Sequence, residues 1–329
     1  MAMQRSQASW LGLPLLALGL GAIAQPAVAE SYPTDTIRIV LSGPAGTPPD
    51  IVTRIVANEL GQSEGWRIVV ENKPGAIGTI AATEVLKQPA DGHTIFGFAL
   101  GTSAAPALLP NISYRLDVDF APVIKLITSH HVLVVNPSVP AKSLAELAAL
   151  LKENPDKFTF SSGGFGTPAH LTGEQFKMHT GARVAHVPYR ALPQAIADLV
   201  NGTNHYQFIT ALPVLDLIAA GNLRALAVTA PTRLPALKDV PTVVEAGFPQ
   251  LVIEEWVGWV VKSSTPNAIV VRLNDATNKA LAKPSVREAL AKIAAEPAGG
   301  SPGEFGAHIT SQMAHWARVV KDAGIKIRE

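Results

Sequence analysis

The tripeptide Gly-Thr-Pro occurs twice in this chain, at residues 46–48 and 166–168, each time after a short β-like run and before a helix-like one. In both copies the threonine can cap a helix, because its hydroxyl accepts a hydrogen bond from a free backbone N–H group. Proline fits the first helical position because it has no N–H to lose. Free N–H groups and the helix dipole attract anions, so two such helix starts suit a ligand with one or two carboxylates. Taken alone, each copy reads more simply as an ordinary helix cap.

The residues after each tripeptide continue the two expected helices. Asp50 stands three residues after Thr47, as in a capping box in which Asp replaces the usual Glu. Apolar residues then recur at helical spacing and predict a helix over residues 49–60. After the second tripeptide, His170 occupies the third helical position. Its side chain can hydrogen-bond a carboxylate or pack back on the loop, and we favour the structural role.

The first 29 residues have the pattern of a secretory signal peptide. Arg5 precedes an apolar stretch over residues 10–24, and Ala27-Val28-Ala29 supplies the small residues that a signal peptidase needs before Glu30. The apolar stretch is interrupted by proline and glycine and is shorter than the roughly 20 residues of a spanning helix. We therefore expect cleavage near Ala29 and a soluble periplasmic protein.

The composition excludes several classes of function. The full chain has 27 basic residues, of which Arg5 lies in the signal peptide, so 26 remain against 26 acidic residues. No cluster of Lys and Arg occurs, which argues against a nucleic-acid partner. The lack of cysteine excludes disulfides, thiolate metal sites, cysteine nucleophiles and lipid-modified cysteine. No cofactor is expected.

The mature chain alternates strand-like and helix-like segments, which predicts parallel sheets with ligands at the carboxyl ends of the strands. The expected strands are residues 37–41, 66–71, 93–99, 132–135, 158–161, 184–188, 206–210, 225–229 and 252–261. The expected helices are residues 49–60, 78–87, 143–152, 194–200, 213–220, 266–282 and 303–323, with a further one opened by the second Gly-Thr-Pro.

This order predicts two α/β lobes joined by two or more crossings of the chain. Residues 30–128 and 252–329 are expected to form the first lobe, and residues 129–251 the second. The C-terminal part thus completes the lobe in which the mature chain begins. Such an architecture is typical of a hinged binding protein with its ligand between the lobes.

Eight motifs in series resemble the periplasmic solute-binding proteins of tripartite tricarboxylate transporters, the Bug family, over the whole mature chain. They are Tyr32-Pro33, residues 44–50 (PAGTPPD), 70–76 (VENKPGA), 89–92 (PADG), 161–163 (SSG), 167–171 (TPAHL), 186–190 (HVPYR) and 239–247 (DVPTVVEAG).

The resemblance implies a type II periplasmic-binding-protein fold with two doubly wound lobes that close on a small carboxylate by hinge motion. It also implies delivery of that ligand to the transporter's membrane subunits, and we expect a monomer. In this family the loops that open the first helix of each lobe hold a ligand carboxylate, largely through backbone amides and bridging waters. These loops correspond here to residues 43–50 and 161–170.

The chain departs from the family pattern at several positions. Thr47 follows Gly46 where the family has a second glycine, and residues 191–193 (ALP) replace a small glycine-rich stretch. Residues 204–207 (NHYQ) and Thr210 also differ from the family pattern, and Phe165 is larger than the usual residue. These changes suggest an altered pocket that accepts a larger or aromatic carboxylate. With the resemblance, the expected ligand is a di- or tricarboxylate or an aromatic carboxylate.

The candidate ligand-binding residues therefore lie in these loops and at strand ends. Arg190 can pair with a distal carboxylate or remain a surface cation. Phe165 and Tyr189 can line the cleft or belong to the core. The full set is Gly46, Thr47, Pro48, Thr102, Ser103, Ser161, Ser162, Gly163, Phe165, Gly166, Thr167, His170, Tyr189, Arg190 and Thr210.

Two other functions stay open beside transport. A secreted α/β hydrolase could assemble a Ser-His-Asp site from distant residues, although the chain contains no Gly-x-Ser-x-Gly, His-Glu-x-x-His, phosphate-loop or dinucleotide motif. His130 and His131 are adjacent on an expected strand and so point to opposite faces, which is unsuitable for one metal ion. A receptor that presents its ligand to a membrane sensor is the third reading.

Overall fold

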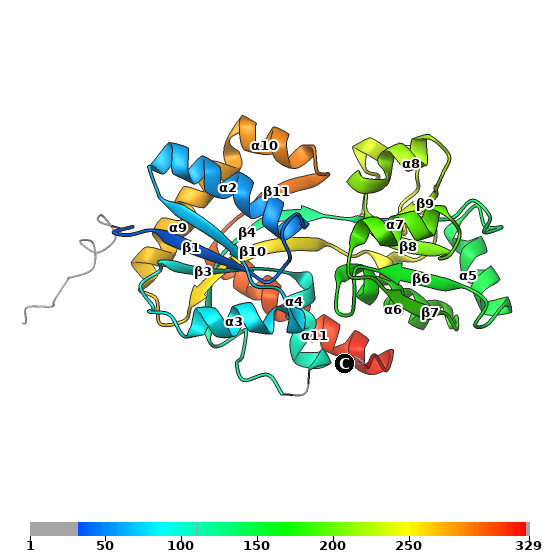
Figure 1. The fold of residues 1–329 in the computed structure, drawn as a ribbon, viewed down its shortest axis with the longest axis horizontal. Helices are drawn as coiled ribbons and strands as arrows, with labels where there is room; N and C mark the ends of the chain where they lie inside the picture. The colour runs from blue at the N-terminus through cyan, green and yellow to red at the C-terminus, as the bar shows by residue number, and fades with distance from the viewer. Residues whose placement is uncertain (1–31, 110, 327–329) are drawn as a thin grey trace, which may run out of the picture.

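The computed structural model describes residues 32–109 and 111–326. The predicted signal peptide lies outside the described residues. The chain forms two α/β lobes that lie side by side, each built around its own sheet (Figure 1). Among the described residues, no helix is both long enough and apolar enough to cross a bilayer.

The first lobe contains a six-stranded sheet in the order β11-β4-β10-β3-β1-β2. Strands β1, β2 and β3 are parallel, as expected, but β10 runs antiparallel to both β3 and β4. The physical reason is that β4 leaves this lobe for the second one and β10 returns from it. The strands are β1 (Ile37–Leu41), β2 (Ile68–Asn72), β3 (Thr94–Ala99), β4 (Phe120–Ser129), β10 (Glu255–Lys262) and β11 (Ala295–Gly299).

The second lobe contains a five-stranded sheet in the order β7-β6-β8-β5-β9. Strand β6 is parallel to β7 and β8, whereas β5, which enters from the first lobe, is antiparallel to β8 and β9. The strands are β5 (His131–Val135), β6 (Thr159–Ser162), β7 (Ala185–Pro188), β8 (Tyr206–Thr210) and β9 (Arg224–Val228).

Helices cover both faces of each sheet (Figure 1). In the first lobe α2, α9 and α10 pack on one face and α3, α4 and α11 on the other; in the second, α5 and α6 lie opposite α7 and α8. The helices are α2 (Pro48–Glu64), α3 (Thr79–Leu86), α4 (Leu100–Leu108), α5 (Leu144–Glu153), α6 (Pro168–Thr180), α7 (Leu192–Val200), α8 (Leu215–Ala219), α9 (Asn267–Ala282), α10 (Pro284–Ala291) and α11 (Pro302–Asp322).

Four elements differ from the sequence expectation. Strand β4 was not expected, because Pro122 and Lys125 interrupt its apolar pattern. No helix was expected at α4, where Thr102 and Ser103 were placed at a strand end, because its glycine, two hydroxyl residues and Pro106 are poor helix formers. It is helical because its apolar residues pack in one cluster with α11. Helix α10 and strand β11 were also missed, since they fall in a short segment between two strongly periodic helices.

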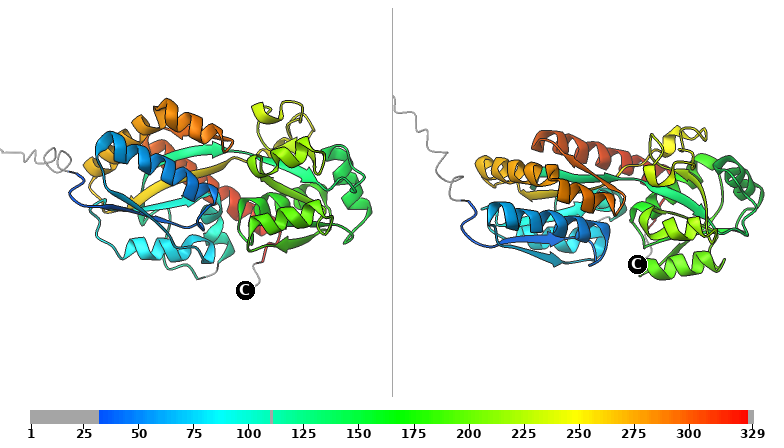
Figure 2. Two further views of the ribbon diagram at one scale, coloured as in Figure 1. Left: turned by 45° about the horizontal axis from the view of Figure 1, so that its top comes forward. Right: turned by 90° about the horizontal axis from the view of Figure 1, so that it is seen from above.

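Two adjacent extended segments join the lobes (Figure 2). One is the passage from β4 to β5 through His130, and the other leads from β9 back to β10 through Ile253. The buried Thr229 hydroxyl connects them: it accepts a hydrogen bond from the His131 N–H group at 2.9 Å and donates one to the Ile253 carbonyl at 3.1 Å. The side chains of His131 and Glu255 also meet here, with 3.0 Å between Nε2 and Oε2. The two crossings therefore form one hydrogen-bonded unit.

Candidate ligand-binding site

The first Gly-Thr-Pro loop is built differently from the cap that the sequence suggested. Thr47 is the N-cap of α2, but its hydroxyl accepts no capping bond; it donates to the Pro44 carbonyl at 2.6 Å. Capping by the side chain was therefore a wrong prediction for this copy. The physical reason is that Pro48 and Pro49 have no N–H group, which removes one of the two usual partners of a cap.

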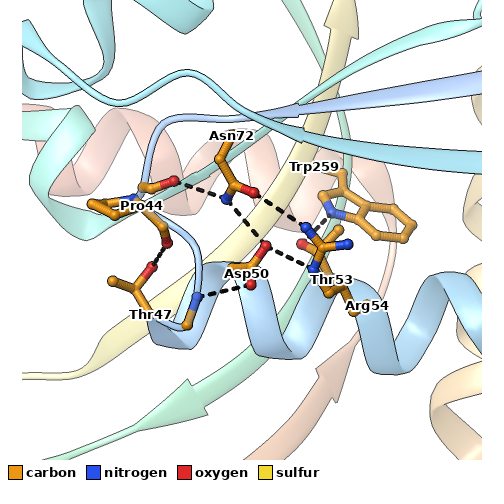
Figure 3. A network of polar contacts seen from close by, with 9 residues as sticks. Pro44, Thr47, Asp50, Thr53, Arg54, Asn72 and Trp259 are labelled. Carbon is orange, nitrogen blue, oxygen red and sulfur yellow. Dashed lines mark hydrogen bonds and ion pairs between the residues drawn. The ribbon is translucent and has the colours of Figure 1, made fainter.

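Asp50 fixes this loop through its carboxylate (Figure 3). The carboxylate accepts hydrogen bonds from the Gly46 N–H at 2.9 Å, from Arg54 Nε at 2.9 Å and from Asn72 Nδ2 at 3.1 Å. The same Asn72 amide donates to the Gly43 carbonyl at 3.0 Å. Asp50 does reach back as in a capping box, but it binds Gly46 rather than the cap residue. Gly46 is left-handed (φ 78°), which turns its N–H toward the carboxylate.

This network also sets the electrostatics at the start of α2. Burial by itself would raise the pKa of Asp50, but the hydrogen bonds from Gly46 and Asn72 and the Arg54 guanidinium outweigh it and hold the pKa below its usual value. A buried carboxylate thus already occupies the positive end of the helix dipole. The first helix start therefore offers an anion fewer free donors than the tripeptide alone suggested.

The second Gly-Thr-Pro loop confirms the predicted cap. The Thr167 hydroxyl accepts a hydrogen bond from the His170 N–H at 3.4 Å and donates one to the Gly164 carbonyl at 2.7 Å. Gly166 is left-handed (φ 73°) and donates its N–H to Nδ1 of His170 at 3.2 Å. His170, which is 2% exposed, therefore holds the loop from inside, as the structural reading of this residue predicted.

An aromatic cluster lies behind this loop. The His170 and His186 rings are 4.3 Å apart between centroids, and the Phe165 ring meets both edge-on at 5.4 and 5.2 Å. Nε2 of His186 lies 2.7 Å from the Ser162 hydroxyl. His186 thus contacts two candidate residues, the Phe165 ring and the Ser162 hydroxyl. It was not itself a candidate, and the sequence analysis named it only as part of a family motif.

Burial keeps both imidazoles neutral. Desolvation, together with the charge of Lys177, lowers the pKa of His170 from 6.5 to about 4. Desolvation, with smaller contributions from His170 and Lys177, lowers the pKa of His186 to about 3. At neutral pH the second loop therefore presents only neutral side chains from this cluster.

We expect acid to destabilise the protein through His170. The folded protein binds this proton only near pH 4, whereas the unfolded chain binds it near pH 6.5, so stability falls as the pH falls between these values. Urea unfolding should show a loss of about 1 kcal/mol from this residue between about pH 7 and pH 5.5. In His170→Asn the new Oδ1 can still accept the Gly166 N–H. This variant should take up close to one proton fewer on unfolding, which flattens the dependence of the unfolding free energy on pH. An unchanged slope would contradict the assignment.

The remaining candidates of the first lobe, Thr102 and Ser103, lie in α4 rather than at a strand end. The Ser103 hydroxyl donates to the Leu100 carbonyl at 2.6 Å, which leaves it a structural role. The Thr102 hydroxyl donates to the Ser42 hydroxyl at 3.3 Å. Ser42 was not predicted as a site residue. The feature that could have identified it is its position directly after β1, at the carboxyl end of a parallel strand, where ligands bind in such sheets. The N-cap of α4 is Ala99, which cannot cap the helix through its side chain, so the first N–H groups of α4 have no side-chain acceptor among the described residues.

The two lobes meet at this helix start. A β-carbon added at Gly101 would lie 2.6 Å from the carbonyl oxygen of Gly166, so the backbones of α4 and of the second loop are in direct contact. The structure thereby brings Thr102 and Ser103 together with Gly166, Thr167 and their loop.

Other candidates are placed less favourably for a ligand. The Ser161 hydroxyl is buried and donates to Gln207 Oε1 at 3.2 Å. The Tyr189 hydroxyl donates to Asp198 at 2.7 Å. Arg190 and Gly163 are exposed, and Thr210 is half-buried at the end of β8, opposite His131 in the sheet. Within the described residues, no group of three His, Asp or Glu side chains could hold a metal ion.

Known proteins resemble this chain over most of its length. The family model described as "Tripartite tricarboxylate transporter family receptor" matches residues 52–325. Protein BugT of Bordetella pertussis is 34% identical over 311 residues, which cover 93% of this chain and 94% of that protein. The chain belongs to the tripartite tricarboxylate transporter receptor family. It is therefore a solute-binding receptor of a transport system and not an enzyme, which removes the hydrolase reading.

Solved structures of similar proteins match the fold of this chain over nearly its whole length. The structure "R. palustris Rpa4515 with adipate" is 33% identical, with a TM-score of 0.81 over 90% of this chain and 99% of that one. MatC from Rhodopseudomonas palustris with bound malate is 31% identical, with a TM-score of 0.79 over 88% of this chain and 100% of that one. This receptor therefore has the two-lobed fold of periplasmic binding proteins of this type.

Proposed function

We propose that this receptor captures a small carboxylate, a di- or tricarboxylate or an aromatic acid, between its lobes and delivers it to the membrane subunits of a tripartite transporter. The observation that carries the proposal is the adipate-bound relative, whose fold matches this chain over 90% of its length. The malate-bound relative supports the same ligand class.

We further propose that neutral donors recognise the carboxylate. The second loop presents backbone N–H groups at the start of α6, and α4 presents N–H groups without a side-chain cap beside Thr102. Arg190 is the nearby cation that could meet a second carboxylate, since it is exposed and makes no hydrogen bond among the described residues. Recognition through such donors predicts a weaker dependence on salt than a pair of arginines would give.

Hinge motion would open and close the site. We propose residues 30–128 with 252–329 as one rigid lobe and residues 129–251 as the other. The division falls at His130 and near Ile253, where the two crossings lie side by side. We also propose that the protein is a monomer in the periplasm after cleavage near Ala29.

A thermal-shift screen of residues 30–329 tests this function. Aliphatic di- and tricarboxylates, amino acids and aromatic acids are compared, with adipate and malate among them. A ligand at a hundredfold excess over its Kd should add about 2.7 kcal/mol of stability, which raises Tm measurably. A shift confined to one class of acid supports the proposal and names the class.

A variant in the second loop tests whether the ligand binds there. Thr167→Tyr fills the loop and should abolish the thermal shift while leaving the unfolding transition cooperative. Wild-type affinity in this variant would exclude the loop as the carboxylate site, and no shift of the wild-type protein with any acid would contradict the proposed function.

A further inference from the structure

The two lobes touch through glycine backbones that leave no room for a side chain. Gly101 is the second residue of α4 in the first lobe, and Gly166 belongs to the second loop in the other lobe. A β-carbon on Gly101 would approach the Gly166 oxygen to 2.6 Å, a distance that real Cβ atoms essentially never show. Because the opposing atom belongs to the backbone, it cannot move aside as a flexible side chain would.

Ile77 holds the same glycine from another side. A β-carbon on Gly166 would lie 2.8 Å from Cδ1 of Ile77 and 3.1 Å from its Cγ1 and Cγ2. Ile77 adopts a left-handed backbone (φ 51°, ψ 38°), which a β-branched residue rarely tolerates. Strain of this kind persists only where surrounding structure enforces it, and it is frequent in gripping and switching segments.

Apolar burial accompanies the backbone contact. Leu171, in the first turn of α6 of the second lobe, is fully buried and belongs to the hydrophobic cluster of α3, α4 and α11 in the first lobe. Separation of the lobes would return this side chain to water, which is unfavourable.

We propose that Gly101, Gly166 and Ile77 form a latch that holds the closed receptor through direct contact between the lobes, in addition to the ligand. Leu171 supplies the apolar part of the latch. The latch rests on the proposed hinge-closing function. It goes beyond that function because contacts within the protein, and not the ligand alone, then stabilise the closed state. These glycines act as positioning residues: without them the second loop cannot reach α4. Since the latch favours the closed state before the ligand arrives, part of the ligand-free population is closed.

Gly101→Ala is the decisive variant. Gly101 has no left-handed φ and lies in a helix, so alanine suits the local backbone and should not lower Tm. Its methyl group collides only when the lobes meet. Gly303→Ala is the matched control, because Gly303 is also the second residue of a helix, α11, and its nearest neighbour would be the Ser301 hydroxyl at 4.0 Å.

The distance between the lobes can be measured directly, since the chain has no cysteine of its own. Lys87 and Lys152 are exposed residues of different lobes. Spin labels attached to Lys87→Cys and Lys152→Cys report the distance between the lobes by double electron–electron resonance. In the Gly303→Ala background we expect a short-distance component without ligand that grows with adipate. In the Gly101→Ala background that component should disappear without ligand, and the Kd for adipate should rise at least tenfold.

The outcomes separate the latch from the function. An unchanged short-distance component in Gly101→Ala overturns the latch, even where carboxylate binding persists. A single long distance in the control with every acid of the screen overturns hinge closure and therefore the proposed function. Should Gly101→Ala fail to fold, Ile77→Ala provides a second test: it should reduce the short-distance component without ligand, and an unchanged component would contradict the latch.

Discussion

Replacing Asp50 by alanine is expected to lower the free energy of unfolding by about 3 kcal/mol and to weaken ligand binding at least tenfold. The carboxylate, 4% exposed, is the common acceptor for the Gly46 N–H, the Asn72 amide and Arg54. Its removal leaves the first two donors without this acceptor in a partly buried place, which costs more than the bonds themselves contribute. The first loop then loses its fixed shape, so a ligand must order it on binding.

Urea unfolding and calorimetric titration measure the two effects. Glu288→Ala is a suitable control, because Glu288 is exposed on α10 and its side chain makes no hydrogen bond among the described residues. Since the fold lowers the pKa of Asp50, its contribution is complete at neutral pH and is lost only in acid, below about pH 4. A stability loss within error of the Glu288 control would show that the loop does not depend on this carboxylate.

A second large effect is expected at the two crossings between the lobes. Glu255→Ala should destabilise the protein by about 3 kcal/mol, because it leaves the His131 imidazole buried without its partner. His131 and Glu255 are 3% and 6% exposed, and Nδ1 of His131 already has no hydrogen-bond partner within the described residues. Glu255→Gln retains an acceptor oxygen for Nε2 and should cost about 1 kcal/mol or less.

Comparison of the two Glu255 variants distinguishes a hydrogen bond from a charge effect. Both are measured by urea unfolding, and ligand affinity is measured alongside. Equal losses for alanine and glutamine would mean that the negative charge itself stabilises the crossings. A loss of binding without a loss of stability would instead point to a role of Glu255 in the hinge motion.

The amino-acid sequence by itself determined the alternation of strands and helices and the start of a helix after each Gly-Thr-Pro. Strand β1 was predicted to the residue, and the helix predicted from residue 143 is capped by Ser143, whose hydroxyl accepts from the Glu146 N–H at 3.1 Å. These features depend on periodicity and on capping within a few residues, which a single sequence records. The family resemblance rested on motifs of the same local kind.

Only the tertiary structure decided what each loop offers a ligand. Thr47 and Thr167 stand in the same tripeptide, yet only Thr167 caps its helix, because a second proline and the distant Asn72 change the surroundings of the first copy. The neutrality of His170 likewise depends on burial beside His186, 16 residues away. The contact of Gly101 with Gly166 joins residues of different lobes. Burial, charge and steric exclusion arise from residues far apart in the chain, so local spacing cannot specify them.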